Sequence, residues 1–314
     1  MTNKKYNAVF FGTPYFAVPV LESIIKLPYL DLKAVVTQPD KPAGRKQELA
    51  PPPVKTVALD NDVSVLQLEK IKGEEFEREF KKLNPDVAII VAYGRIIPQN
   101  LLDIPQYGFL NIHASLLPKY RGASPIQYAI LEGEKETGVT LMKIDQGLDT
   151  GPIISQKQID IAPGDNFETL HNKLAKLGAV LLEESLPDYL GSKIPPASQN
   201  EFHATGTKII EKEDGRIDWN KSAKRIERQI RAFAPWPGAY CWYNNKRLKI
   251  IEAALAESVI NLEPGKVGSR DKSVLVGCGK GNLKLKIIQL EGKKPQPISE
   301  FIKGYPEFCK ARLE

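Results

Sequence analysis

The chain has 314 residues, enough for two ordinary domains, and its 42% hydrophobic and 26% charged residues are typical of a soluble globular protein. No run approaches the roughly 20 consecutive apolar residues of a membrane span, and residues 1–7 lack the apolar character of a signal peptide. We therefore expect a cytoplasmic protein. The three cysteines are scattered and no Cys or His pair has metal-ligand spacing, so we expect reduced thiols and no metal site.

The net charge of +6 is unevenly distributed along the chain. Residues 204–314 contain 22 Lys and Arg against 13 Asp and Glu, a net charge of +9, and the remainder, with 22 basic and 25 acidic residues, carries −3. This distribution fits a catalytic body joined to a domain that binds a polyanion. Charge alone does not distinguish that arrangement from a basic surface that only keeps a domain in solution.

The first half of the chain alternates short apolar runs with helical patterns. Apolar runs bounded by Gly, Pro or Asp predict buried strands at residues 8–11, 32–37, 86–91 and 108–113, and later strands are predicted at 138–144 and 152–161. Helical patterns cover residues 16–26, 54–60, 74–83 and, most clearly, 168–190. This βαβ order predicts an α/β fold with a doubly wound, mostly parallel, Rossmann-like sheet.

The pattern changes at residues 191–208, where Pro195, Pro196 and Gly206 indicate a linker. Beyond it, a helix is predicted at 222–233, and short strands at 239–243, 247–253, 273–278 and 283–290 predict a small, OB-like β-barrel. We therefore divide the chain into a catalytic domain (1–190), a linker (191–208) and a basic β-barrel domain (209–314).

Three common motifs are missing. The first strand ends in Phe11-Gly12-Thr13-Pro14 without further glycines, so the dinucleotide fingerprint is absent and NAD is disfavoured. The chain also contains no P-loop for ATP and no GxSxG nucleophile elbow.

One stretch places an amide and an imidazole together. Asn111 and His113 end the predicted strand 108–113, and alternate residues of a strand point to the same side. Both face one space at the carboxyl end of a parallel sheet, where ligands bind in open α/β folds. An Asn amide can donate to an oxyanion and a His can move a proton near neutral pH, which suits acyl transfer. Taken alone, however, the pair is better explained by a hydrogen-bonded structural histidine.

The sequence NIHASLLP at residues 111–118, followed by DQGLDTG at residues 145–151, resembles the folate-dependent formyltransferase and hydrolase superfamily. The resemblance covers the whole N-terminal domain, and two separated motifs agree in order and spacing. The three functional residues of that superfamily, an Asn, a His and an Asp, fall on Asn111, His113 and Asp149. By itself Asp149 would be read as an ordinary turn residue.

The resemblance implies the chemistry. The co-substrate would be 10-formyltetrahydrofolate, in a pocket formed in part by Ser115, Leu116, Leu117 and Pro118. An amine would attack the formyl carbon directly, Asn111 and a protonated His113 would stabilise the resulting oxyanion, and Asp149 would orient the imidazole and help to move the amine proton. The reaction would need no metal and no covalent enzyme intermediate.

The acceptor amine is indicated by residues 37–53, a segment that carries Lys41, Arg45 and Lys46 and is too rich in Pro and Gly for regular structure. A loop of this length is usually functional or disordered. It resembles the insertion loop by which the family members that formylate methionyl-tRNA reach the acceptor stem, and Arg45 matches the arginine of that loop. The resemblance implies methionyl initiator tRNA as the acceptor, in translation initiation. An exposed basic loop without a partner would have the same sequence character.

Residues 231–240 resemble the start of the second domain of the same family members, in which an excess of Lys and Arg suits contacts to RNA phosphates. Formyltransferases that act on amino sugars carry a similar domain, so this segment discriminates weakly. We expect Trp236 to pack in the core of this domain rather than to stack on RNA.

Three alternative functions stay open: a formyltransferase for a nucleotide-linked amino sugar, a non-catalytic RNA-binding protein, and a folate hydrolase. The Arg45 loop and the +9 charge of the last part favour tRNA over the amino sugar. The joint presence of Asn111, His113 and Asp149 speaks against a protein that only binds. We expect a monomer, because one chain holds both candidate binding surfaces.

Overall fold

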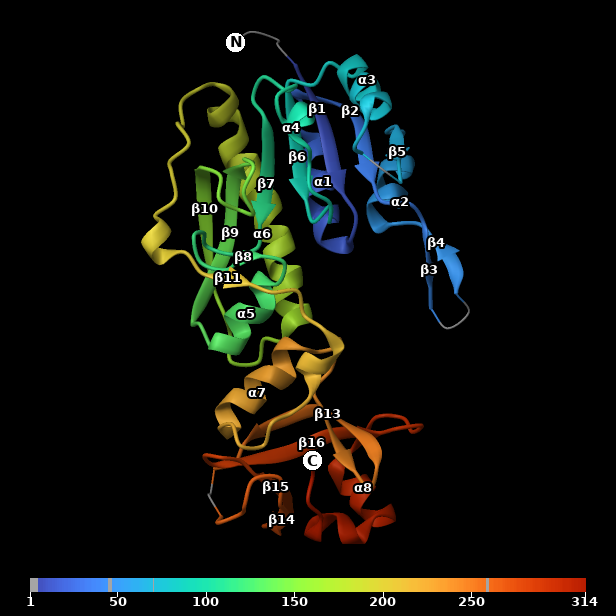
Figure 1. Ribbon diagram of the computed structural model, residues 1–314, viewed down its shortest axis with the longest axis vertical. Helices are drawn as coiled ribbons and strands as arrows, with labels where there is room; N and C mark the ends of the chain where they lie inside the picture. Colours follow the sequence, from blue (N-terminus) through green and yellow to red (C-terminus); the bar gives the residue numbers. More distant parts are fainter. Residues whose placement is uncertain (1–4, 45–46, 70, 258–259) are drawn as a thin grey trace. The chain divides into compact units, whose positions relative to one another are not determined.

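The computed structural model describes residues 5–44, 47–69, 71–257 and 260–314 (Figure 1). The chain folds into two compact units. The first comprises Met1–Gly122, Glu136–Ile159 and His171–Gly206, and the second comprises Ala123–Lys135, Asp160–Leu170 and Thr207–Glu314. The segments of the two units alternate along the chain, and the domain limits given above remain a prediction.

A seven-stranded sheet forms the centre of the first unit. Its order is β10 (Ile153–Asp160), β9 (Glu136–Lys143), β7 (Phe109–His113), β6 (Val87–Val91), β1 (Tyr6–Gly12), β2 (Leu30–Thr37) and β5 (Val65–Gln67). The five strands from β7 to β5 are parallel to their neighbours, whereas β9 runs antiparallel to β7. The predicted mostly parallel α/β sheet is confirmed.

Helices cover this sheet on both faces. They are η1 (Tyr15–Ala17), α1 (Val18–Lys26), α2 (Pro53–Asp60), α3 (Glu74–Lys82), α4 (Gln99–Leu102) and most of α6 (Phe167–Leu190). Helix α3 shows why such segments fold: Phe76 and Phe80, four residues apart, enter one apolar core with Phe11 and Phe109. Glutamates in its first turn and lysines in its last turn complement the helix dipole.

The packing of α6 decides which side of β7 is open to function. A Cβ atom on Gly178 of α6 would lie 2.8 Å from the Ile112 side chain. The helix therefore approaches β7 closely at Gly178, where the helix has no side chain. Because side chains alternate along a strand, Asn111 and His113 point away from this contact. The helix therefore seals one face of β7 and leaves the polar pair on the other.

The second unit is built on an antiparallel sheet. Its order is β12 (Tyr240–Tyr243), β13 (Lys246–Leu255), β16 (Asn282–Leu290), β15 (Ser273–Gly277) and β14 (Val267–Arg270), and β17 (Gln296–Pro297) also pairs with β16. The helices of this unit are α5 (Pro125–Glu132), η3 (Lys212–Gly215), α7 (Ala223–Ala232), α8 (Ile298–Gly304) and η4 (Pro306–Lys310). The prediction of a small, barrel-like β domain is confirmed.

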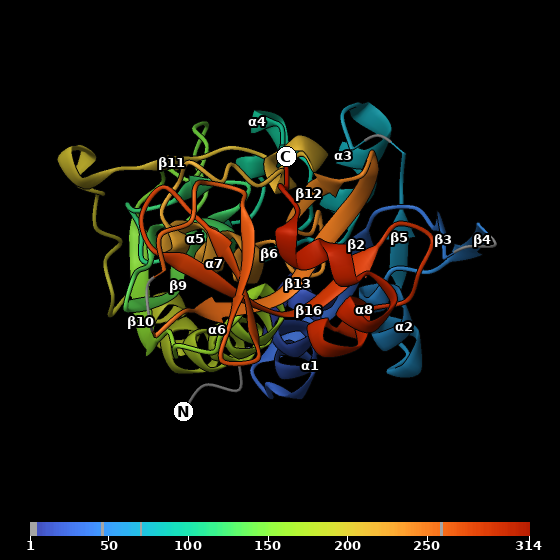
Figure 2. The same cartoon turned by 90° about the horizontal axis from the view of Figure 1, so that it is seen from below.

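Two expectations about this chain are wrong. Residues 37–53 do contain regular structure, because β3 (Lys41–Ala43) pairs antiparallel with β4 (Glu48–Ala50), in a hairpin that projects from its unit (Figures 1 and 2). Trp236 is not a core residue: 58% of its surface is exposed, in the connection between α7 and β12. Its apolar character alone predicted burial, but the loop turns the ring outward.

Candidate active site

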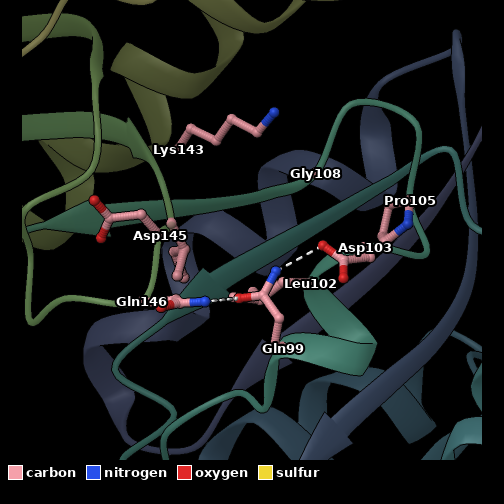
Figure 3. Close-up of a pocket in the computed structure, with 9 residues that line it drawn as sticks. Gln99, Leu102, Asp103, Pro105, Gly108, Lys143, Asp145 and Gln146 are labelled. Carbon is pink, nitrogen blue, oxygen red and sulfur yellow. Dashed lines mark hydrogen bonds between the residues drawn. The ribbon is translucent and has the colours of Figure 1, made fainter.

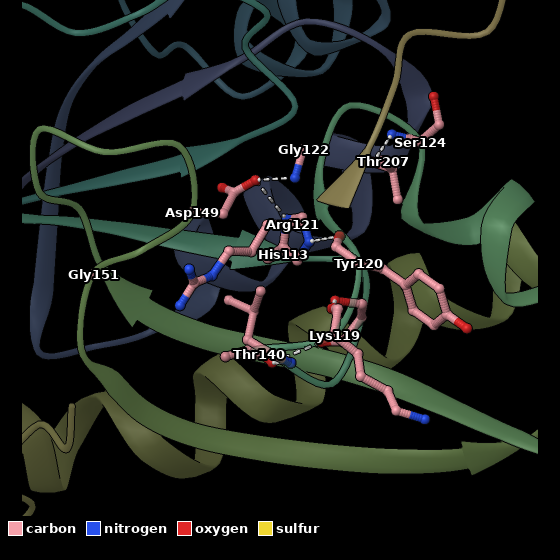
Figure 4. A network of polar contacts seen from close by, with 12 residues as sticks. His113, Lys119, Tyr120, Arg121, Gly122, Ser124, Thr140, Asp149, Gly151 and Thr207 are labelled. Carbon is pink, nitrogen blue, oxygen red and sulfur yellow. Dashed lines mark hydrogen bonds and ion pairs between the residues drawn. The ribbon is translucent and has the colours of Figure 1, made fainter. Parts of the chain in front are cut away.

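His113 is the last residue of β7 and is held by a backbone carbonyl (Figure 4). Its Nε2 atom lies 2.9 Å from the Tyr120 carbonyl oxygen, and only 6% of the residue is exposed. A carbonyl can only accept a hydrogen bond, so Nε2 carries a proton and donates it. The second ring nitrogen, Nδ1, is left for another partner.

Asp149 faces that nitrogen from the loop between β9 and β10. Its Oδ2 atom lies 3.6 Å from His113 Nδ1 and accepts a hydrogen bond of 2.8 Å from the Gly122 backbone N–H. The Asp149 backbone has a φ of 55°, a left-handed conformation that is uncommon outside glycine. Two residues that are 36 positions apart are thus brought together at the carboxyl end of β7.

Asn111 lies two residues before His113 on the same side of β7. Its backbone is flanked by Ile90 of β6 and Met142 of β9, and its side chain is half-buried. Within the described ranges, nothing hydrogen-bonds its side-chain amide. The amide therefore has donor capacity that a ligand could use.

The segment after His113 is held by hydrogen bonds within itself and from strands β9 and β10. The Ser115 hydroxyl donates to the Lys119 carbonyl, while the Thr140 hydroxyl donates to the Ser115 carbonyl and accepts from the Leu117 N–H. Gln156 of β10 donates to the Leu117 carbonyl and to Thr140. Ser115 and Leu117 are buried, whereas Leu116 and Pro118 are partly exposed. Of the four residues predicted to bind the co-substrate, only Leu116 and Pro118 present surface.

A cavity of about 460 Å³ lies beside the start of the Asp149 loop (Figure 3). Its lining includes Gln99 and Leu102 of α4, together with Lys143, Asp145 and Gln146. Gln146 donates to Gln99 across it at 3.2 Å. Its volume is in the range of small-molecule sites, but none of Asn111, His113 and Asp149 lines it. Within the part of the chain that the structure describes, no cluster of three or more His, Cys, Asp or Glu side chains could hold a metal ion.

The residues predicted to bind tRNA lie in the hairpin. Lys41 begins β3, is exposed, and donates to the Gln38 side chain at 2.7 Å. Gln38 in turn donates to the Tyr93 carbonyl at 2.8 Å, so the base of the hairpin is tied to the end of β6. Arg45 and Lys46 lie outside the described residues.

A smaller hollow, of about 190 Å³, lies on the sheet of the second unit and is lined by Arg247, Lys249, Gln289 and Glu291. We call it the basic hollow. The Arg247 guanidinium lies 4.7 Å from the centre of the Tyr240 ring and 5.9 Å from that of Trp242. Cations beside aromatic rings are a common surface for nucleic-acid contacts.

Sequence reasoning missed several residues of the first unit that hold the site, and Gln199 is the most distant of them in sequence from His113. Gln199 lies in the predicted linker, and its side chain reaches the backbone of Asp149 and Gly151. Arg121 binds both Gln199 and Glu201. Its hydrogen bond to Glu201 lowers the pKa of the Glu201 carboxyl and raises the pKa of the Arg121 guanidinium. The only signal in the sequence was the polar run Gln199-Asn200-Glu201 within a Pro-rich stretch.

Comparison with known proteins identifies the class. Residues 6–186 match the family model described as formyl transferase, and residues 209–306 match that of the formyl transferase C-terminal domain. The chain belongs to the formyl transferase family, and the resemblance seen in its two motifs is confirmed.

Individual relatives narrow the comparison to members of this family with named activities. The methionyl-tRNA formyltransferase of Caldanaerobacter subterraneus subsp. tengcongensis is 47% identical over 298 residues, which cover 95% of this chain and 96% of that protein. The methionyl-tRNA formyltransferase of Koribacter versatilis is 49% identical over 299 residues, 95% of each chain. Among solved structures, an N-formyltransferase from Helicobacter canadensis in complex with folinic acid and dTDP-3-aminofucose has a TM-score of 0.68 at 23% identity, over 90% of this chain and 98% of that one. At that identity the likeness shows the fold alone.

None of the helices in the described ranges is long and apolar enough to cross a membrane.

Proposed function

We propose that this protein transfers the formyl group of 10-formyltetrahydrofolate to the amino group of methionine on initiator tRNA, in the cytoplasm and as a monomer. The observation that carries the proposal is the meeting of His113 Nδ1 and the Asp149 carboxylate, 3.6 Å apart, at the strand end that also bears the Asn111 amide. The names of the full-length relatives support the choice of acceptor.

The reaction forms one C–N bond and breaks another. The lone pair of the neutral amine attacks the formyl carbon, and the carbonyl oxygen becomes an oxyanion. The C–N bond to the folate then breaks, so that the amine keeps the formyl group and its displaced proton ends on the folate nitrogen. The residues of this site have two tasks: to stabilise the oxyanion and to move that proton.

Asn111 suits the first task, because its amide has donors without partners in the described structure. One such donor is worth on the order of 10²–10³ in rate. His113 suits the second, because its Nε2–H donates a hydrogen bond to the Tyr120 carbonyl, which leaves Nδ1 to take part in proton transfer. Asp149 lies at that nitrogen and can pair with it when the ring is charged. Proton transfer by such a pair contributes roughly 10²–10⁴ in rate.

The co-substrate is proposed to contact the Ser115–Pro118 segment. Because the Ser115 hydroxyl is already bonded to the Lys119 carbonyl, this contact would come from the partly exposed surfaces of Leu116 and Pro118. The segment then fixes the shape of the pocket, and its braces to Thr140 and Gln156 keep that shape.

The RNA is proposed to bind through charge. Lys41 is exposed at the base of the hairpin, and Arg45 and Lys46 follow it in sequence. The proposed binding domain, residues 209–314, would add phosphate contacts, with the basic hollow as one such site. Contacts to phosphates position an RNA without reading its sequence.

The experiment compares acceptors. The protein is incubated with 10-formyltetrahydrofolate and either charged initiator tRNA, a nucleotide-linked amino sugar, or buffer, and the fate of the formyl group is followed. We expect formylmethionyl-tRNA only. Transfer to the sugar and not to the tRNA would reject the acceptor, formate release in buffer at a comparable rate would indicate a hydrolase, and no consumption would leave a binding protein.

A further inference from the structure

The Asp149 loop, residues 144–152, is mostly at the surface, and the hydrogen bonds within this described segment are donated by the Gly147 N–H and the Thr150 hydroxyl to the Asp145 carboxylate, not to Asp149. Residues 145–148 are exposed, and the loop reaches the site only at Asp149, whose backbone is left-handed. Gly151, at its end, has no room for a side chain, because a Cβ atom there would lie 1.8 Å from the Lys143 carbonyl oxygen. A strained conformation of this kind persists only where neighbouring groups hold it.

Gln199 supplies that hold. Its Nε2 atom donates to the Asp149 carbonyl and to the Gly151 carbonyl, both at 2.8 Å. Its Oε1 atom accepts from Arg121 Nε at 3.0 Å and Nη2 at 2.8 Å. The orientation of the amide is unambiguous, since two carbonyls need a donor and a guanidinium needs an acceptor. All the hydrogen-bonding capacity of the Gln199 amide is thus directed at the loop and at Arg121.

Arg121 closes the arrangement from the other side. Its guanidinium also binds Glu201 through two oxygens, at 2.7 and 2.8 Å, and the next residue, Gly122, donates to the Asp149 carboxylate. The carboxylate of Asp149 and its backbone carbonyl are therefore held from two chain segments that meet at Arg121. Figure 4 shows Arg121, Gly122 and Asp149 around His113.

We propose that Gln199, supported by Arg121, is a positioning residue of the active site: its side-chain amide fixes the backbone of the Asp149 loop and thereby aims the Asp149 carboxylate at His113. This inference rests on the proposed function, in which Asp149 acts on His113. It makes the segment after the first 190 residues part of the catalytic apparatus and not only a connection.

The segment around Gln199 is anchored independently of this side chain. Ala197 and Ile153 exchange two backbone hydrogen bonds of 2.8 Å. Downstream, the Arg121 N–H donates to the Thr205 carbonyl, and the Tyr120 N–H donates to the Thr205 hydroxyl. A change at Gln199 should therefore release the Asp149 loop and leave the path of the segment unaltered.

The decisive variant is Gln199→Glu. A glutamate has the same shape and remains an acceptor for Arg121, so it preserves any role in packing or in anchoring the segment. It cannot donate to the two carbonyls, and it brings a negative charge to them. The matched control is Asn200→Ala, because Asn200 is the next residue and its side chain bonds only the Phe202 N–H among the described residues.

We expect Gln199→Glu to lower kcat by about 10- to 100-fold, the size of effect that a misplaced catalytic group produces. The KM values for both substrates and the melting temperature should be close to those of the parent, and Asn200→Ala should behave as the parent. In an Asp149→Asn background, Gln199→Glu should cost nothing further, because residues that act through one group are not additive. If Gln199→Glu lowers the melting temperature, the same cycle is measured with Arg121→Gln in its place. That variant should also lower kcat in the parent and cost nothing further in the Asp149→Asn background.

The outcomes separate this inference from the function on which it rests. A normal rate for Gln199→Glu with an impaired Asp149→Asn would overturn the positioning role alone. Losses that multiply in the double variant would do the same, since Gln199 would then act elsewhere. A normal rate for Asp149→Asn would remove the proposed catalytic role of Asp149 itself.

Discussion

The candidate active site of the first unit and the exposed lysines of the second unit are held in opposite ways. His113 and Asp149 expose 7% and 15% of their side chains, and each is fixed by hydrogen bonds to backbone groups. The basic surface depends on side chains at the solvent, such as Lys208 and Lys303, which expose 61% and 70% and pair only with acids beside them. Chemistry at one carbon atom needs fixed geometry, whereas binding of a polyanion needs charge that can adapt.

The largest effects should come from the candidate active site. We expect His113→Ala and Asn111→Ala each to lower kcat/KM by on the order of 10²–10³, through loss of proton transfer and of an oxyanion donor respectively. Affinity for RNA should stay unchanged, because neither residue belongs to the basic segments proposed to contact the RNA. Steady-state formylation assays and RNA titrations would measure the two quantities. A near-normal rate in either variant would reject the role given to that residue.

A smaller effect is expected from the hairpin. Arg45→Ala should weaken use of tRNA by on the order of tenfold, the value of one hydrogen bond to a charged group. The rate of folate-dependent chemistry at saturating tRNA should change little. Formylation measured against tRNA concentration at two salt concentrations tests this expectation, and an unchanged KM for tRNA would exclude a contact from Arg45.

The basic hollow should affect the strength and the salt dependence of RNA binding, and not the chemical step. Lys249→Gln keeps most of the side chain and removes its charge, so the slope of log K against log salt should fall by about one if Lys249 contacts one phosphate. Lys82→Gln, a change at an exposed lysine of α3, is the matched control. Equal slopes for Lys249→Gln and the parent would remove the hollow from the RNA-binding surface.

The smallest effect should be that of Trp236 on stability. Because its ring is 58% exposed, Trp236→Ala should change the free energy of unfolding by no more than about 0.5 kcal/mol. A buried tryptophan would instead cost about 3–5 kcal/mol. Denaturant titration of the parent and of Trp236→Ala distinguishes these values. A loss of about 3–5 kcal/mol in the free energy of unfolding would show that Trp236 packs in the core after all.

The parts of the fold that were predictable are those with long apolar patterns. The strands at residues 86–91 and 108–113 and the helix at 168–190 agree with β6, β7 and α6 within one residue at each end. The three-residue strands β3 and β4 are too short for a periodicity of their own, and their pairing depends on the turn between them. Short elements such as β5 and α4 escaped prediction for the same reason.

The candidate site divides in the same way. The shared side of Asn111 and His113 follows from strand alternation, and their link to Asp149 follows from a family motif. Gln199 could not be found, because its partner carbonyls lie 48 and 50 residues away and any polar side chain in a Pro-rich stretch would look alike. Contacts from a side chain to a distant backbone leave no pattern in sequence.

The most direct test of the central claim is a double-variant cycle on His113 and Asp149. The rate of the chemical step is measured in single turnovers, with both substrates saturating, for His113→Ala, Asp149→Asn and the double variant. If the imidazole and the carboxylate act as one unit, the double variant should be no slower than His113→Ala alone. Losses that multiply would show that the two side chains work separately and would contradict the account.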